Sequence, residues 1–241
     1  MGKEDRDNKV KLLWEDRFFL VVYKPAGMLS VPAETEKGGP VLSDWIRDNI
    51  EIDLSIRDDL RDGFSFKRRM GVVHRLDKDT SGLVLVAKSE AVFLKLQGFF
   101  KKREVEKEYL ALVWGETSST GEVKMPIERD RSRFGRFRVG IEGKEALTKF
   151  RRIGLKRNQG KFLSLLEVFP WTGRTHQIRV HFSYLGWPIV GDGLYGRENL
   201  PSQKRLFLHA QKIVLPHPIS RQRLEFKSPC PADLWLLWEA I

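Results

Sequence analysis

The sequence contains a single cysteine, Cys230, among its 241 residues. One thiol cannot form a disulfide within the chain, and it cannot supply the several thiolates of a structural metal site. Apolar runs are also short, since none approaches the about 20 residues that a membrane-spanning helix needs. The N-terminal segment lacks the apolar core of a secretory signal peptide. These absences favour a reducing, cytoplasmic setting.

Acidic residues are fewer than basic ones. Asp and Glu number 32 against 43 Lys and Arg, which gives a formal net charge of +11 and a sequence pI near 9.8. A basic surface attracts polyanions and accelerates their capture. Nucleic acid is therefore the partner that the charge favours most, with an anionic membrane surface second.

The positive charge is concentrated between Lys124 and Arg157, where twelve basic residues face only four acidic ones. Within it, residues 128–138 read ERDRSRFGRFR, which we call the arginine-rich segment. Its five arginines are Arg129, Arg131, Arg133, Arg136 and Arg138. Guanidinium groups suit phosphates, and the interleaved phenylalanines could stack on unpaired bases. A basic surface loop exposed to water explains the composition equally well.

The common cofactor motifs are absent. There is no glycine-rich dinucleotide or P-loop pattern, no G-x-S-x-G and no H-E-x-x-H. GDGLYG, residues 191–196, has none of these spacings, and we interpret it as a turn. The sequence thus disfavours ATP, nicotinamide and zinc chemistry, and we expect no cofactor.

Hydrophobic periodicity predicts an α+β fold. Strands are expected at 18–25, 83–87, 108–114 and 161–170, and a hairpin over 206–215. Helices are expected at 41–50, 90–102 with Ser89 as N-cap, and 173–186 with Gly186 beyond its end. This order indicates a mixed, largely antiparallel central sheet with flanking helices and loops. We expect residues 1–11 to be loose and residues 12–241 to form a single catalytic domain.

The segment HRLDKDTSG, residues 74–82, places polar residues between two apolar runs. Asp77 lies in the expected turn, and Thr80, Ser81 and Gly82 suit a tight turn that can hold a carboxylate. Such an aspartate could act as a nucleophile or a general base. A turn aspartate that only organises the loop is the more frequent case, so spacing alone does not decide between them.

A second polar group occupies TGRTHQIRVHF, residues 172–182, where Arg174, His176, Arg179 and His181 are close together in sequence. Arg179 could pair with a buried carboxylate such as Asp77 and keep it ionised. A basic helix face turned toward RNA is the alternative. A metal site formed with His74 is disfavoured, because histidines held by hydrogen bonds within the fold are more common.

Tyr109, in the expected strand EKEYLALVW, is a third candidate. A tyrosine in a strand usually belongs to the core, with its hydroxyl hydrogen-bonded at the edge. It could instead offer its ring to the base of a substrate.

Together, HRLDKDTSGLVLVAKS, EKEYLALVWG and TGRTHQIRVHF resemble, in order and spacing, the three core motifs of the RluA family of pseudouridine synthases. The similarity extends over FFLVVYKPAGMLSVPA near the N-terminus and FLHAQKIVLPHP and FKSPCPADL near the C-terminus. It therefore covers the chain from about residue 12 to about residue 234. LSVPA and VWG are most similar to the subgroup that acts on large-subunit ribosomal RNA and tRNA.

The resemblance implies an RNA pseudouridine synthase, an isomerase that needs no cofactor, with an active-site groove across the sheet. Asp77 matches the family's catalytic aspartate, Tyr109 the tyrosine that stacks on the target base, and Arg179 the basic partner of the aspartate. Arg75 matches the arginine that enters the helix space left by the flipped nucleotide. We also expect RNA contacts from His74, Arg174, His176 and the arginine-rich segment.

Two other functions compete with this one. A non-catalytic RNA-binding or ribosome-assembly protein on the same fold explains the charge, but not why Asp77, Tyr109 and Arg179 are all present. A membrane-surface protein lacks the long basic amphipathic helix it would need. We expect a monomer, because RNA rather than a second subunit should cover the basic face. The sequence does not identify the RNA or the uridine.

Overall fold

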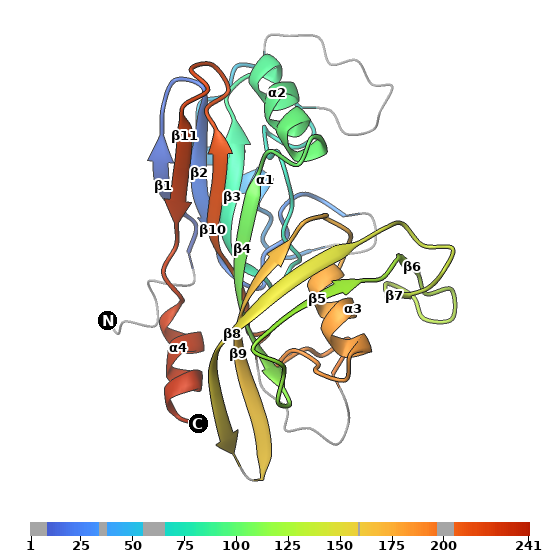
Figure 1. The fold of residues 1–241 in the computed structure, drawn as a ribbon. Helices are drawn as coiled ribbons and strands as arrows, with labels where there is room; N and C mark the ends of the chain where they lie inside the picture. The colour runs from blue at the N-terminus through green and yellow to red at the C-terminus, as the bar shows by residue number, and fades with distance from the viewer. Residues whose placement is uncertain (1–8, 34–37, 55–65, 159, 197–204) are drawn as a thin grey trace. The chain divides into compact units, whose positions relative to one another are not determined.

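The computed structural model describes residues 9–33, 38–54, 66–158, 160–196 and 205–241 (Figure 1). The chain divides into two compact units. The first comprises the chain up to Val105 and the segment Lys212–Ser228, and the second comprises Glu106–Gln211 and Pro229–Ile241. The expected single catalytic domain over 12–241 stays a prediction.

The first unit is built on antiparallel strands. β1 (Lys11–Glu15) pairs with β2 (Phe19–Lys24), and β2 pairs with β3 (Ser81–Ala87). Every residue of β2 and β3 is buried. Their nearly continuous apolar sequences are typical of strands that are covered on both faces. β1 begins at the last residue of the segment that was expected to be loose.

Two helices accompany these strands. α1 (Leu42–Asn49) and α2 (Glu90–Lys101) lie within the ranges expected from sequence. α2 lies beside β3 (Figure 1) and buries the apolar stripe Val92, Phe93, Leu96 and Phe99. Ser89 occupies the N-cap position, as expected, and its side chain makes no capping hydrogen bond.

The prediction of a hairpin over 206–215 is wrong. β10 (Leu208–Pro216) is one continuous strand that begins in the second unit and ends in the first. Its antiparallel partner is β11 (Arg223–Lys227). The middle of β10, Gln211–Lys212, contains none of the residues that favour a tight turn. The turn lies after Pro216, where His217 Nδ1 accepts hydrogen bonds from two backbone N–H groups.

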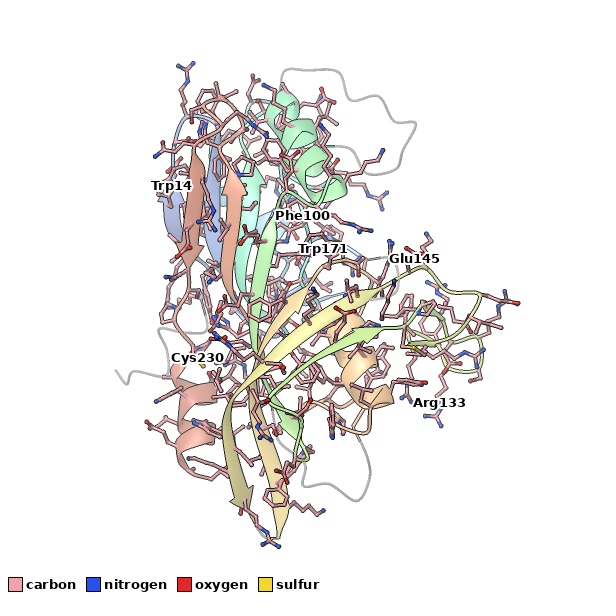
Figure 2. The ribbon with its side chains drawn as sticks, viewed as in Figure 1. Trp14, Phe100, Arg133, Glu145, Trp171 and Cys230 are labelled. Carbon is pink, nitrogen blue, oxygen red and sulfur yellow. The ribbon has the colours of Figure 1, made fainter. Side chains whose placement is uncertain are left out.

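In the second unit, antiparallel pairing joins β4 (Glu106–Trp114), β9 (Lys161–Pro170), β8 (Leu147–Asn158) and β5 (Thr120–Lys124) in this order. β6 (Ile127–Arg129) and β7 (Phe137–Val139) form a separate two-stranded sheet. The basic stretch 124–157 is therefore mostly strand rather than loop. The arginine-rich segment is the β6–β7 hairpin with its connecting loop, and Arg133 lies in that loop (Figure 2).

The second unit also contains α3 (Gln177–Tyr184) and α4 (Ala232–Glu239). α3 is shorter than the expected 173–186. The Gln177 side-chain oxygen accepts hydrogen bonds from the Arg174 N–H and the Thr172 hydroxyl, and this holds residues 172–176 in a turn. Gly186 has the positive φ expected beyond the helix end. Ile178 and Phe182 pack into the core as expected, whereas Leu185 is 37% exposed.

Candidate active site

Asp77 lies in a tight turn that leads into β3. The Thr80 N–H donates a 3.1 Å hydrogen bond to the Asp77 carbonyl oxygen and closes the turn. Leu76 and Thr80 are buried, and Asp77 is partly buried between them. Arg75 is exposed. The backbone of Asp77 is thus fixed on both sides at the start of a buried strand.

Ser30 fastens the turn from one side. Its hydroxyl donates a 2.9 Å hydrogen bond to the Leu76 carbonyl oxygen and accepts one of 3.0 Å from the Leu76 N–H. Ser30 is buried, so water competes little for these bonds. The loop after β2 therefore holds the residue that precedes Asp77.

Lys24 fastens the turn from the other side. It is the last residue of β2 and is completely buried. Its ammonium donates to the carbonyl oxygens of Pro25 at 2.8 Å, Met28 at 2.6 Å and Lys78 at 3.0 Å. Sequence reasoning missed Lys24 and Ser30. The available signal was a charged residue at the end of an apolar strand, because a buried lysine needs several acceptors.

His74 has structural partners. Its Nε2 atom accepts a 3.1 Å hydrogen bond from the Leu85 N–H, and its ring packs against Phe100 on α2. It therefore anchors the turn to β3, and its expected contact with RNA stays a prediction. Burial and the charge of Arg75 lower the pKa of the Arg69 guanidinium to about 10. The guanidinium groups of Arg69 and Arg75 are therefore close enough for their charges to interact.

Arg179 lies on α3 and is buried in the second unit. Its Nε and Nη2 atoms donate to the two carboxylate oxygens of Asp192 at 2.9 and 2.8 Å. Burial alone would raise the pKa of Asp192. The Arg179 charge and the N–H groups of Tyr195 and Leu194 outweigh burial and hold this pKa below its usual value. Arg179 is not part of a solvated basic face, and its expected pairing with Asp77 stays a prediction.

Asp192 belongs to GDGLYG, which forms the expected turn. At Gly191 φ is +75°, and a Cβ atom there would overlap the backbone of Arg205. Only glycine fits this position without strain. Sequence reasoning identified the turn but missed its aspartate as the partner of Arg179.

Tyr195, in the same turn, joins α3 to the arginine-rich segment. Its hydroxyl accepts a 2.9 Å hydrogen bond from the Phe137 N–H and lies 2.9 Å from His176 Nδ1. The guanidinium groups of Arg179 and Arg136 lie 5.2 and 5.1 Å from the centre of its ring. His176 and Arg136 therefore help to dock the β6–β7 hairpin against the segment that carries Arg179.

Tyr109 lies on β4 and is partly buried. Lys107, two residues earlier, lies on the same face of the strand because side chains alternate. The Lys107 ammonium donates a 3.1 Å hydrogen bond to the Thr172 carbonyl oxygen, and burial lowers its pKa to about 8. Lys107 thereby ties the strand of Tyr109 to the turn that precedes α3. Sequence reasoning did not select it.

His181 is part of the core. It is fully buried, and its ring nitrogens lie 2.9 Å from the Thr148 hydroxyl and 3.0 Å from the Met125 carbonyl oxygen. Burial lowers its pKa, so the imidazole stays neutral at physiological pH. No group of three or more His, Cys, Asp or Glu residues in the described part of the chain could hold a metal ion.

The arginine-rich segment extends toward solvent. Arg129, Arg131, Arg133 and Arg138 are exposed, and Phe134 is 85% exposed in the loop between the strands. Arg138 pairs with Glu128 at 2.8 Å, and Arg174 Nε donates to the Glu145 carbonyl oxygen. Arg131 and Arg133 are the exposed arginines of the loop itself.

Comparison with known proteins identifies the family. The model of the RNA pseudouridylate synthase family matches residues 18–184. The chain belongs to this family. An uncharacterized RNA pseudouridine synthase of Chloroflexus aurantiacus is 41% identical over 89% of the chain, which spans 64% of that relative. Ribosomal large subunit pseudouridine synthase D of Pseudomonas aeruginosa is 35% identical over 96% of the chain, which spans 72% of that relative.

A solved structure agrees with this assignment. The human RNA pseudouridylate synthase domain containing 1 superposes with a TM-score of 0.69 at 30% identity, over 93% of this chain and 84% of that chain. The expected resemblance, the isomerase class and the α+β fold with a largely antiparallel sheet are thereby confirmed.

Proposed function

We propose that the chain converts uridine to pseudouridine in structured RNA, in large-subunit ribosomal RNA, tRNA or both. The observation that carries the proposal is the turn of Asp77, a partly buried carboxylate whose neighbours on both sides are fastened by Ser30 and Lys24. A reacting group must be held in place for efficient catalysis. The name of the Pseudomonas relative supports ribosomal RNA as the substrate.

Asp77 is the catalytic residue of this proposal. The bond between the uracil N1 and the ribose C1′ breaks, the uracil turns, and its C5 forms a new bond to C1′. The Asp77 carboxylate either attacks C1′ or abstracts a proton next to it, and both roles require the ionised form. Nothing is oxidised or reduced, so no cofactor is needed.

Arg179 is the proposed partner of the Asp77 carboxylate. Its Nε and Nη2 groups are already held by Asp192, which fixes the plane of the guanidinium. In this proposal the Asp77 carboxylate accepts hydrogen bonds from the Arg179 guanidinium. An ion pair of this kind favours the charged form of a carboxyl group.

Arg75 and Tyr109 act in flipping the target base out of the RNA stack. A uridine within a stack must be extruded before it can react, at a cost of a few kcal/mol. The exposed Arg75 guanidinium stacks where the base was and offsets part of that cost. The Tyr109 ring receives the extruded uracil, and such stacking contributes about 1–3 kcal/mol.

The arginine-rich segment binds the RNA backbone without selecting sequence. His74, Arg174 and His176 lie beside these groups in sequence and complete the expected RNA contacts.

In the described part of the chain, no helix is long and apolar enough to cross a membrane. We infer a monomer in the cytoplasm, with RNA covering the basic surface.

The activity is tested on large-subunit ribosomal RNA and tRNA transcribed without modifications. After incubation with the purified chain alone, chemical mapping should locate pseudouridine at one or a few uridines. A non-catalytic RNA-binding protein would retain the RNA and leave every uridine unchanged. Added ATP, NADH or divalent metal chelator should not alter the yield.

Tyr109 tests the stacking role. We expect Tyr109→Phe to keep activity within about threefold, because the ring is retained, and Tyr109→Leu to lose about 5–150-fold, as expected from about 1–3 kcal/mol of stacking. The measurement is the single-turnover rate of pseudouridine formation. Equal losses in the two variants would assign the role to the hydroxyl instead.

Arg131 and Arg133 test the backbone contacts. If each neutralises one phosphate, the Arg131→Gln/Arg133→Gln variant should reduce the dependence of log Kd on log salt concentration by about 1.4 on single-stranded RNA. Fluorescence anisotropy with a labelled oligonucleotide at several salt concentrations gives this slope. An unchanged slope would show that the loop does not contact phosphate. Lys95→Gln, an exposed lysine of α2, is the matched control.

A further inference from the structure

Lys107 is a partly buried cation with little compensation. Its ammonium makes one hydrogen bond, to the neutral carbonyl oxygen of Thr172. Among the described residues no carboxylate lies within ion-pair distance of it. An ammonium ion that leaves water normally recovers its hydration energy from a carboxylate or from several acceptors. Lys24 is the contrast within this chain, because its ammonium has three carbonyl acceptors.

The single bond also defines the position of Lys107. Thr172 is buried. Its hydroxyl group donates a hydrogen bond to the Gln177 side chain and accepts one from the Leu147 N–H. The ammonium is therefore held against a rigid turn. Lys107 lies on the face of β4 that carries Tyr109, and the Cα atoms of the two residues are about 7 Å apart along the strand.

We propose that Lys107 is a catalytic residue that neutralises the negative charge of the uracil while it is detached from the ribose. This inference rests on the proposed function and on the stacking of the base on Tyr109. When the C1′–N1 bond breaks, its electron pair stays on the uracil and spreads over N1, O2 and O4. When C5 bonds to C1′, that charge is consumed; the C5 proton then passes to water and N1 takes up a proton from water, so the product base is neutral. Lys107 exchanges no proton in this account.

The chemistry explains why the charge is left uncompensated in the free protein. A fixed ammonium that has no carboxylate interacts more strongly with a charge that develops on the substrate, because no internal partner must be displaced. The depressed pKa of about 8 has burial as its cause, and it still leaves the group charged near neutral pH. A phosphate of the RNA is the other anion that Lys107 could contact. Loss of a phosphate contact would weaken RNA binding, whereas loss of a contact with the detached uracil would slow the reaction.

The test compares Lys107→Gln and Lys107→Ala with Lys107→Arg in single-turnover assays at saturating RNA, together with RNA dissociation constants. We expect the two neutral variants to lose at least about 100-fold in rate with dissociation constants within about threefold of wild type. Lys107→Arg should recover at least a tenth of the rate. Ethylammonium added to Lys107→Ala should raise its rate at least tenfold. Lys95→Gln should behave as wild type.

Three outcomes would overturn the inference. A normal rate at saturation with a weakened dissociation constant would assign Lys107 to a phosphate. Unchanged rates in both neutral variants would remove it from catalysis. Loss of activity that ethylammonium does not rescue, with a lowered melting temperature, would make it only a structural tie to Thr172. If the wild-type chain itself forms no pseudouridine, the proposed function fails instead, and this difference separates the two claims.

Discussion

Asp77→Asn should abolish pseudouridine formation, with a single-turnover rate at least about 10³-fold below wild type and RNA affinity within about threefold. The substitution keeps the size of the side chain and removes its charge. The hydrogen bonds described for this turn are accepted by the backbone carbonyl oxygens of Leu76, Asp77 and Lys78. The substitution changes only a side chain, so the turn should keep its conformation. Chemical mapping of product and a filter-binding assay measure the two quantities.

Asp79 provides the matched control. It is an exposed aspartate two residues later in the same turn. Asp79→Asn changes the net charge by the same amount and should leave the rate within about threefold of wild type. If the two variants lost activity equally, the effect would come from the charge of the turn and not from a reacting carboxylate.

Asp192→Asn should destabilise the chain by about 3 kcal/mol, since it leaves the buried Arg179 guanidinium without its counter-charge. The asparagine oxygen can still accept the N–H groups of Leu194 and Tyr195 in the place of Oδ1, whereas its NH2 group replaces Oδ2 and cannot accept the bond from Arg179 Nε. Urea unfolding measures the loss. Activity should fall as well, because Asp192 fixes the guanidinium that is proposed to hold Asp77.

The control for this pair is Glu167→Gln, which breaks the Arg151–Glu167 ion pair. Arg151 is 61% exposed in its side chain, and exposed pairs contribute about 0–1 kcal/mol. A loss in Asp192→Asn no larger than in Glu167→Gln would contradict the structural importance of the buried pair.

The pair also sets a pH dependence. The pKa of Asp192 is lower in the folded chain than in the unfolded one, so its contribution to stability is complete above the unfolded value of about 4 and declines as the pH falls further. Acid should therefore destabilise wild type more than Asp192→Asn. The difference between their urea midpoints should shrink below about pH 4.

Much of the fold could be predicted because buried segments carry strong apolar patterns. β2, β3, β4 and β9 have nearly continuous apolar runs, and all four lie within or overlap their expected ranges. β8 was missed because Lys149, Arg151 and Arg157 occupy its exposed positions and hide the alternation. Its register also shifts between Arg152 and Gly154, where the ring of Trp238 leaves no space for a Cβ atom.

Sequence motifs select candidate site residues, but they do not select the residues of distant segments that support them. Asp77, Arg75, Tyr109 and Arg179 were selected through their motifs. Lys24, Ser30 and Asp192 were not, because their contacts join segments far apart in sequence. Propensity and spacing report local structure and do not reveal such long-range bonds.

The central claim is that Asp77 reacts as a carboxylate paired with Arg179. A crystal structure of the chain bound to an RNA oligonucleotide that contains the target uridine tests this most directly, through the distance between the Asp77 carboxylate and Arg179 Nη1. The account predicts an ion pair within about 4 Å, with Arg179 still bound to Asp192. A carboxylate of Asp77 that faces bulk water, with the uridine bound elsewhere, would contradict it.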